Sequence, residues 1–257
     1  MSLFKLPGFF FSMLLVLVLS STIQAAEPFD ADQTKQVEAI VRDYILANPE
    51  IIAEAMTALE NRRIAAERLA QTSAVTDRAD ILFNSEHQAV LGNPDGDVTL
   101  VEFFDYNCGF CKRAMGDMFT LIDNDPNLRV VLKELPVLGE ASLEAARVAL
   151  AVNTMHPDQY VEYHARLLGA RGRASGATAI NLAVEMGMDK DTIQLASMTE
   201  NVNTAIQEVR SLAVALGVSG TPSYVIGDEV VFGAVGYDQL KEKILQARAC
   251  GGKTTTC

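Results

Sequence analysis

The sequence carries little positive charge. Its 21 lysines and arginines stand against 33 aspartates and glutamates, a formal net charge of -12, and they form no basic run and no cluster interleaved with aromatic residues. Because contacts to phosphate groups dominate affinity for nucleic acids, this absence argues against a nucleic-acid partner. Cysteine is also scarce, since four residues in 257 are too few for a disulfide-stapled scaffold. A hydrophobic fraction of 49% is ample for a packed domain and an additional element.

Ligands for a structural zinc ion are missing at useful spacings. Such a site needs four ligands. Cys108 and Cys111 form one close pair, but the other two cysteines lie far off near the end of the chain, and the three histidines show no ligand spacing relative to either pair. We therefore expect neither a metal nor a cofactor. His156 and His164 are expected to be solvated helix residues.

Long apolar runs are absent apart from one near the start of the chain. Residues 9–19 are apolar but too short to span a bilayer comfortably, Lys5 precedes them, and Ala25 ends a plausible cleavage site. We expect a signal peptide over residues 1–25, with an uncleaved N-terminal anchor as the alternative. No cysteine follows the run, so a lipid-attached N-terminus is not indicated. The mature chain is expected to be soluble and to lie in an oxidising compartment, the periplasm.

Residues 26–84 are predicted to be helical. Asp30 and Gln33 have the spacing of a capping box, and Asn48-Pro49 marks a break followed by a second start. Apolar residues recur at helical spacing on both sides of this break: Val37, Ile40, Val41, Tyr44, Ile45, Ile51, Ile52, Ala55, Met56 and Leu59. Such a stripe must bury against something. It could fold back on the rest of the chain, but the charged, Ala-rich residues 62–79 favour self-association, so this is an expected oligomerisation region and linker.

Residues 85–249 show an α/β pattern. Residues 98–104 form a short apolar run rich in strand formers, a helix is expected to about residue 123, and residues 129–133 follow as a strand, which together make a βαβ unit. A helical stretch covers residues 140–216. The predicted elements that follow are strands at 223–226 and 229–232 and a helix at 237–249. This order predicts a thioredoxin fold with a helical insertion at about 140–200. Residues 250–257 form a tail.

The pair Cys108-Gly109-Phe110-Cys111 lies where the first of these strands meets the helix. Free backbone N–H groups and the macrodipole at a helix start favour negative charge, so the thiolate of Cys108 should be stabilised. Cys111 lies one turn further on, close enough to close a disulfide. Cys108 is then the attacking nucleophile, and Cys111 resolves the mixed disulfide.

Two segments resemble the DsbA family of thiol–disulfide oxidoreductases. Residues 101–112 are similar to the active-site segment of that family, and Gly220-Thr221-Pro222 is similar to its cis-proline loop. The two lie on either side of a helical insertion, as in the family, and the resemblance covers roughly residues 88–249. The helical region before them resembles the copper-sensitivity suppressor proteins, ScsC, of the same superfamily.

This resemblance implies a disulfide isomerase or oxidase that acts on secreted or periplasmic client proteins with cysteines. A membrane redox partner of unknown identity would reset the redox-active centre, and the protein would be a homo-oligomer, either a trimer or a dimer. Pro222 would be a cis-proline packed beside the two sulfurs, leaving the backbone of Thr221 free to pair with an extended client segment. An ordinary trans proline at a strand start is the alternative.

Glu102 precedes Cys108 by six positions, where proteins of this type keep a buried acid under the disulfide. A carboxyl group in an apolar strand has a raised pKa and can accept a proton from the resolving thiol of Cys111. Lys133, on the next predicted strand, is a candidate partner of Glu102. The alternative is that these two residues form only a half-buried ion pair.

The dipeptide Gly109-Phe110 carries no positive charge. The strongest oxidants of the family have Pro-His there, whose histidine helps to stabilise the thiolate, so this centre should be less oxidising. That favours disulfide shuffling or reduction. Lys112 and Arg113 either add positive potential near the thiols or belong to a solvated helix face.

A Cu(I)-binding or copper-tolerance protein that uses the reduced cysteine pair is the alternative function. Met115 and Met118 offer soft sulfur ligands just past Cys111, although methionines at this spacing are more often core filler. Cys250 and Cys257 are expected to form a local structural disulfide, with a second shuttling dithiol as the less favoured choice.

Overall fold

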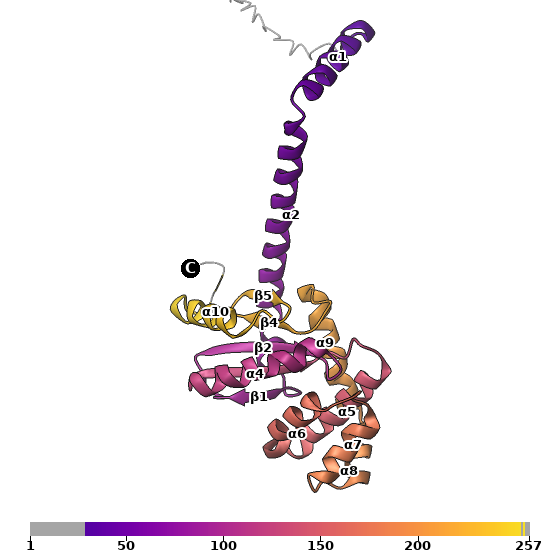
Figure 1. The fold of residues 1–257 in the computed structure, drawn as a ribbon, viewed down its shortest axis with the longest axis vertical. Coiled ribbons are helices and arrows are strands. Elements are labelled where there is room, and N and C mark those ends of the chain that lie inside the picture. Colours follow the sequence, from indigo (N-terminus) through magenta and orange to yellow (C-terminus); the bar gives the residue numbers. More distant parts are fainter. Residues whose placement is uncertain (1–28, 253, 255–257) are drawn as a thin grey trace, which may run out of the picture. The chain divides into compact units, whose positions relative to one another are not determined.

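The computed structural model describes residues 29–252 and residue 254. The chain divides into two compact units, Met1–Leu59 and Glu60–Cys257. Figure 1 labels most of their helices and strands. The expected signal peptide at residues 1–25 lies outside the described residues. No helix in the described part of the chain has the length and apolarity that a membrane crossing requires.

The first unit is helical, as predicted. Helix α1 (Ala31–Ala47) begins at Asp30, whose carboxylate accepts a hydrogen bond of 2.8 Å from the backbone N–H of Gln33. The side chain of Gln33 accepts in turn from the backbone N–H of Asp30, which completes the capping box. The helix ends at Asn48, and α2 (Glu50–Asp77) starts beyond Pro49 and continues into the second unit.

The apolar residues of these helices are exposed in the single chain. No residue of α1 is buried, and Ile40 and Tyr44 are 67% and 60% exposed. We call the following set the N-terminal stripe: Val37, Ile40, Val41, Tyr44, Ile52, Met56 and Leu59. Exposed apolar surface of this extent is uncommon on a soluble monomer and marks an interaction surface.

The second unit is built on a five-stranded sheet with the order β1-β3-β2-β4-β5. The strands are β1 (Ala89–Gly92), β2 (Val98–Phe104), β3 (Leu128–Glu134), β4 (Ser223–Ile226) and β5 (Glu229–Phe232). Strands β2 and β3 run parallel, and the other neighbours are antiparallel. The four predicted strands are confirmed, whereas β1 was not predicted. It is a four-residue edge strand that alternates buried and exposed residues, so it gives little apolar signal.

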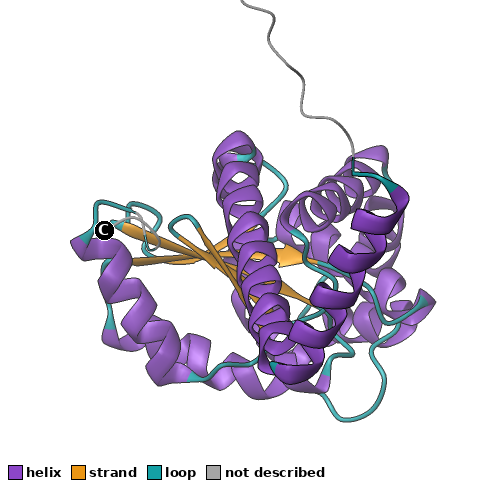
Figure 2. Ribbon diagram, turned by 90° about the horizontal axis from the view of Figure 1, so that it is seen from above, coloured by secondary structure: helices purple, strands orange, loops and turns teal. Residues whose placement is uncertain are grey.

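Helices cover both faces of this sheet, which Figure 2 shows in orange among purple helices. The helices are α3 (Ala79–Asn84), α4 (Gly109–Asn124), α5 (Glu140–Met155), α6 (Pro157–Gly169), α7 (Gly176–Glu185), α8 (Lys190–Ala196), α9 (Glu200–Leu216) and α10 (Tyr237–Ala249). Apolar residues of α4, α6 and α10 form one cluster with the sheet, and those of α3 and α9 form another. Helices α5 to α9 lie between β3 and β4 in the chain, which confirms a thioredoxin fold with a helical insertion.

Strand alternation assigns the side chains of β2 to these two faces. Leu100 and Phe104 belong to the cluster with α4, whereas Val101 and Phe103 belong to the cluster with α9. Successive side chains of a strand point to opposite faces. Glu102 therefore faces α4, the helix that begins at the cysteine pair.

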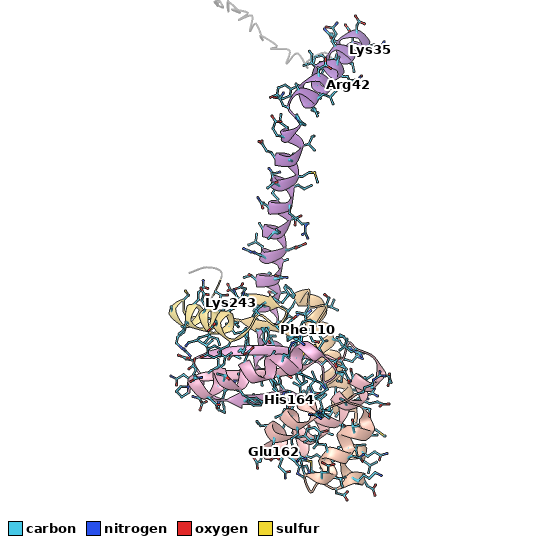
Figure 3. All side chains as sticks on the ribbon, in the orientation of Figure 1. Lys35, Arg42, Phe110, Glu162, His164 and Lys243 are labelled. Carbon is cyan, nitrogen blue, oxygen red and sulfur yellow. The ribbon has the colours of Figure 1, made fainter. Side chains whose placement is uncertain are left out.

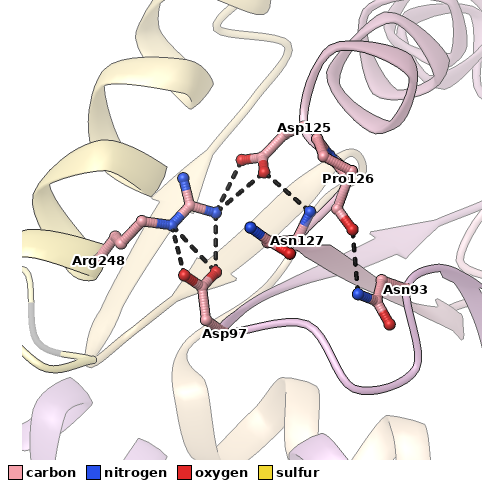
Figure 4. A network of polar contacts seen from close by, with 6 residues as sticks. All are labelled: Asn93, Asp97, Asp125, Pro126, Asn127 and Arg248. Carbon is pink, nitrogen blue, oxygen red and sulfur yellow. Dashed lines mark hydrogen bonds and ion pairs between the residues drawn. The ribbon is translucent and has the colours of Figure 1, made fainter.

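An arginine ties three chain segments together at the far end of α4 (Figure 4). Nε of Arg248, in the last turn of α10, lies 2.8 Å from Oδ2 of Asp97, and its Nη2 lies 2.8 Å from Oδ2 of Asp125. Asp97 precedes β2, and Asp125 caps α4. The hydrogen bonds from Arg248 hold the pKa of Asp97 below its ordinary value of 3.8. The network thus fixes α10 against the loops beside it.

We expect Arg248→Ala to lower the thermal unfolding midpoint by roughly 2–4 °C, because three segments lose their common partner. The loss should shrink in 1 M salt, since the pairs are partly exposed and salt screens them. It should also shrink as the pH falls through the depressed pKa of Asp97, where that carboxylate is protonated. Circular dichroism melts at low and high salt measure this. Arg210→Ala, an exposed arginine of α9, is the control, and equal losses in both variants would contradict the assignment.

Candidate active site

Cys108 and Cys111 lie at the start of α4, as predicted. Cys108 is the N-cap residue, and its sulfur accepts a hydrogen bond of 3.3 Å from the backbone N–H of Cys111. Both cysteines are free thiols, 5% and 0% exposed. The predicted strand-to-helix setting therefore places one sulfur on the free N–H groups of the helix and the other in the core.

The loop before β4 comes to the same place. The Thr221–Pro222 peptide bond is cis, as predicted. The thiol of Cys108 donates a hydrogen bond of 3.1 Å to the backbone carbonyl of Thr221, although 113 positions separate the two in the chain. The structure therefore brings together the two motifs that the sequence singled out.

The two thiols differ in environment. Burial raises the pKa of the Cys111 thiol well above its ordinary value, and the hydrogen bond with Cys108 raises it further. Cys111 is therefore protonated at neutral pH, and a group that accepts its proton must be present if it is to act as a nucleophile.

Glu102 lies on the face of the sheet that α4 covers. It is 2% exposed and lies opposite Leu132 on β3 and Tyr224 on β4. Burial raises the pKa of Glu102 to about 8. Burial and the charge of Glu102, followed by that of Cys111, raise the pKa of the Tyr224 phenol, which places Tyr224 close to both groups. No side chain in the described part of the chain donates a hydrogen bond to the Glu102 carboxyl group, which favours its protonated form.

Lys133 and Glu102 lie on opposite faces of the sheet, so the expectation that these two form an ion pair is wrong. In the parallel register Glu102 lies opposite Leu132, so Lys133 falls opposite Phe103 and points to the other face of the sheet. Its ammonium donates a hydrogen bond of 2.7 Å to the carbonyl of Ile81 and lies 3.7 Å from a carboxylate oxygen of Glu208. Burial lowers the pKa of Lys133 to about 8. It anchors α3 and α9 rather than the redox centre.

Asp105 and Asn107, which the sequence did not single out, shape the turn before Cys108. Asp105 is 2% exposed and accepts hydrogen bonds from the backbone N–H of Asn107, Val137 and Leu138 and from the hydroxyl of Ser142, at 2.7–3.0 Å. Polar residues directly after a buried strand were the available signal. Apart from the bond between the two, the partners of their side chains lie more than 30 positions away and could not be inferred from spacing.

An aromatic cluster packs beside the same turn and contains His164, which Figure 3 labels. The ring of His164 is 1% exposed and lies 4.8 Å from that of Phe104, between centroids. Burial lowers the pKa of His164 to about 3, so the expectation of a solvated histidine is wrong. The phenol of Tyr160 donates a hydrogen bond of 2.9 Å to Glu134, whose pKa is raised chiefly by burial. These polar groups are neutral, as a dry cluster requires.

The residues around Phe110 are more exposed. Phe110 is 59% exposed, is labelled in Figure 3, and carries the guanidinium of Arg113 at 4.4 Å from its ring centroid. The ammonium of Lys112 donates a hydrogen bond of 2.8 Å to the carbonyl of Ala170. The two cations therefore have specific contacts, rather than forming only a solvated helix face.

The other sulfur-containing residues that the sequence singled out are Met115, Met118, Cys250 and Cys257. Met118 is 1% exposed in the core, and Met115 packs against the same cluster, as the core-filler alternative requires. Cys250, at the end of α10, is disulfide-bonded. Cys257 lies outside the described residues.

The raised pKa of Glu102 predicts how stability depends on pH. The folded protein holds this proton up to about pH 8, whereas the unfolded chain releases it near 4.5, so stability falls as the pH rises between these values. Glu102→Gln removes that loss. We expect the variant to match the wild type near pH 4.5 and to exceed it at pH 8.5 by an amount on the order of 4 kcal/mol.

Urea unfolding of both proteins at pH 4.5, 6.5 and 8.5 measures this difference. Glu242→Gln, which removes an exposed carboxyl group from α10, is the control and should follow the wild type at every pH. A Glu102→Gln protein whose stability stays parallel to the wild type across the range would show that this carboxyl group is ionised in the folded protein.

Comparisons with known proteins agree with this architecture. The DSBA-like thioredoxin domain family matches residues 99–245, more than half of the chain, and the copper resistance protein ScsC N-terminal domain matches residues 33–66. A thioredoxin-like oxidoreductase from Silicibacter pomeroyi DSS-3 is 44% identical, with a TM-score of 0.64, over 66% of this chain and 97% of its own.

A linker-deletion variant of ScsC from Proteus mirabilis is 30% identical, with a TM-score of 0.66, over 88% of this chain and 100% of its own. Disulfide bond formation protein D of Bacillus subtilis (strain 168) is 25% identical over 61% of this chain and 75% of its own. With the free cysteine pair at the start of α4 and the cis-proline beside it, these matches show that the chain belongs to the DsbA-like thioredoxin-domain family of thiol–disulfide oxidoreductases and carries an ScsC-type N-terminal region.

Proposed function

We propose that this protein exchanges disulfides with secreted client proteins through Cys108 and Cys111. The observation that carries the proposal is the contact set of the Cys108 sulfur. It accepts from the backbone N–H of Cys111 at 3.3 Å and lies 3.1 Å from the carbonyl of Thr221. The start of a helix stabilises negative charge on a sulfur atom, so this sulfur leaves readily as a thiolate. A free stretch of backbone beside it can pair with an extended segment of a client protein.

In the oxidising direction a client thiolate attacks the Cys108 sulfur of the disulfide. The Cys108–Cys111 bond breaks, a mixed disulfide forms, and Cys111 leaves as a thiolate that must take up a proton. A second client thiolate then attacks the client sulfur of the mixed disulfide and releases Cys108. The client loses two electrons and two protons, and the cysteine pair gains them. Isomerisation uses the same mixed disulfide, which a different client thiolate resolves.

Glu102 is the proposed source and acceptor of the Cys111 proton. Its pKa of about 8 leaves most of it protonated at neutral pH, so it can donate to the departing Cys111 thiolate. In the reverse direction the ionised form accepts the proton of Cys111, whose own pKa is raised by burial. Tyr224 lies opposite Glu102 in the sheet, and the charges of Glu102 and Cys111 both raise the pKa of its phenol.

Export to the periplasm is proposed from the expected signal peptide at residues 1–25. The sequence between the cysteines favours shuffling over strong oxidation, so we propose an isomerase or a weak oxidase. Its client proteins would carry reduced or wrongly paired cysteines, and a membrane redox partner would restore the required state of the pair.

Substitution of each cysteine separates the proposed roles. Cys111→Ser should keep the attack and lose the resolving step, so that mixed disulfides between Cys108 and clients accumulate while turnover is lost. Cys108→Ser should abolish both. Non-reducing electrophoresis and mass spectrometry after mixing each reduced variant with scrambled ribonuclease measure the trapped complex. More trapping by Cys108→Ser than by Cys111→Ser would reverse the two roles.

We also propose that the protein is a homo-oligomer, a trimer or a dimer, assembled through the N-terminal stripe. The stripe exposes large apolar side chains on helices that bury almost nothing of their own. Burial against further copies removes this area from water. Several redox centres held near one client would raise their effective concentration and favour shuffling.

A charge inside the stripe should disrupt assembly. We expect Ile40→Asp to give monomers, because an ionised carboxylate cannot be buried in an apolar contact without a partner. Ala39→Asp adds the same charge to the opposite side of α1 and should leave the oligomer intact. Light scattering of the two variants and of the mature protein gives the mass. A monomeric mature protein contradicts the proposal, as does equal assembly of both variants.

Removing residues 26–60 should give a folded monomer that still oxidises thiols but shuffles scrambled disulfides poorly. The second unit, Glu60–Cys257, has its own sheet and core, which is why it should remain folded. The ratio of oxidation rate to isomerisation rate, measured against the intact protein, checks this. An unchanged ratio would contradict a role of assembly in shuffling.

Copper binding by the reduced pair is the second candidate, favoured by the match of residues 33–66 to the copper resistance protein ScsC N-terminal domain. Two thiolates suit Cu(I). The thioether of Met118 is buried in the same apolar cluster as the two cysteines. A redox titration with and without one equivalent of Cu(I) distinguishes the functions, because tight binding would shift the apparent potential of the pair.

A further inference from the structure

A surface loop is tied to both ends of the cysteine motif. The side-chain amide of Asn107, directly before Cys108, exchanges two hydrogen bonds with the backbone of Ala174, at 2.8 and 2.9 Å. Lys112, directly after Cys111, donates to the carbonyl of Ala170 at 2.8 Å. Residues 170–174, which connect α6 to α7, are therefore held alongside the redox centre.

This loop brings cations to the centre. Arg171 and Arg173 lie between its two anchors, and both are exposed. The guanidinium of Arg173 lies 3.8 Å from the position that a β-carbon on Gly139 would take, in the loop that Asp105 holds. Arg113 covers the ring of Phe110. None of these three arginines has a carboxylate within ion-pair distance in the described part of the chain.

Apolar side chains lie among these cations. Phe110 is 59% exposed, and Val137 and Leu138, whose backbone N–H groups bind Asp105, are 46% and 49% exposed. We call this set the active-site rim: Phe110, Arg113, Val137, Leu138, Arg171 and Arg173. It combines exposed apolar side chains with positive charge near the two ends of the cysteine motif.

We propose that the rim selects clients whose reactive cysteine is flanked by acidic residues. An extended client segment would place its cysteine at Cys108, its apolar side chains on Phe110, Val137 and Leu138, and its carboxylates on the arginines. Planar guanidinium groups bind carboxylates with two parallel hydrogen bonds, which gives orientation as well as attraction.

The charge of the whole chain opposes this selection at long range. The formal net charge is -12, so distant parts repel an acidic client. At physiological ionic strength, charges more than about 8 Å apart are largely screened, and the groups beside the sulfur decide. Of the acidic residues in the same region, Asp105 is buried among its hydrogen-bond donors and Glu144 accepts from the backbone N–H of Gly176. Asp117 on α4 and Glu140 at the start of α5 are the others, whereas the three arginines of the rim are exposed. The arginines of the rim therefore attract the carboxylates of a client only when the client is bound or within about 8 Å of them.

This inference rests on the proposed function, and its test keeps the two apart. The probes are three synthetic peptides of equal length, each with two cysteines flanked by glutamate, glutamine or lysine. Each peptide dithiol reacts with the Cys108–Cys111 disulfide to give the peptide disulfide and the protein dithiol, a transfer of two electrons and two protons. Single-turnover rates are measured in 0.15 M salt, with dithiothreitol as an uncharged reference.

We expect the full-length protein to react with the glutamate peptide about tenfold faster than with the lysine peptide, and the glutamine peptide to lie between them. Arg171→Glu/Arg173→Glu should invert this order. Arg210→Glu/Lys241→Glu changes the net charge equally, on α9 and on α10 beside the C-terminal end of α4, and should keep the wild-type order.

Equal rates for the three peptides overturn the proposed selection while leaving disulfide exchange in place. An unchanged order in the Arg171→Glu/Arg173→Glu protein does the same, because the preference then arises elsewhere. Equal inversion in both double variants would assign the effect to net charge and not to the rim. A wild-type protein that reacts with neither dithiothreitol nor any peptide overturns the proposed function itself.

Discussion

The buried carboxylate of Asp105 joins the segments from which the redox centre is made. It follows β2 directly, and its backbone carbonyl accepts the N–H of Cys108 at 3.0 Å while its side chain binds the loop after β3 and the start of α5. A carboxylate in an apolar interior is stable only when its oxygens are satisfied, so these donors are drawn to one point. The position of Cys108 at the head of α4 depends on that convergence. The insertion is tied in as well, because Ser142 bonds both Asp105 and Asn107.

Burial acts in the same direction on the two proton-carrying groups of the centre. It raises the pKa of Glu102 to about 8 and raises that of the Cys111 thiol further. Ionisation of either group is unfavourable, because both side chains are buried. In the proposed mechanism the proton that leaves one is taken up by the other, and the sheet register places Glu102 on the face of the sheet that α4 covers. The same low polarity that makes Glu102 costly to ionise therefore suits it to serve a buried thiol.

The sequence predicts local features of this site well and long-range ones poorly. Strand β2 and the cysteine pair have strong local signals, an apolar run and a fixed spacing at a helix start. The partner of Lys133 was predicted wrongly because adjacency of two strands says nothing of register, and a shift of one residue moves a side chain to the other face. His164 was misplaced because one histidine in a polar helix carries no sign of the ring cluster that surrounds it. The contact between Asn107 and Ala174 spans 67 positions, and no periodicity encodes it.

The dipeptide between the cysteines shows how structure modifies a conclusion drawn from composition. Gly109 and Phe110 carry no charge, which by itself leaves the Cys108 sulfur with only backbone groups for support. Arg113 on the next turn places its guanidinium 4.4 Å from the centre of the Phe110 ring, where the ring's negative face holds it. The positive charge beside Gly109-Phe110 is therefore supplied by Arg113 and not by the dipeptide itself. Because this cation is exposed, water and salt screen its charge. The charge around the motif therefore depends on the residues that follow it as well as on the two residues between the cysteines.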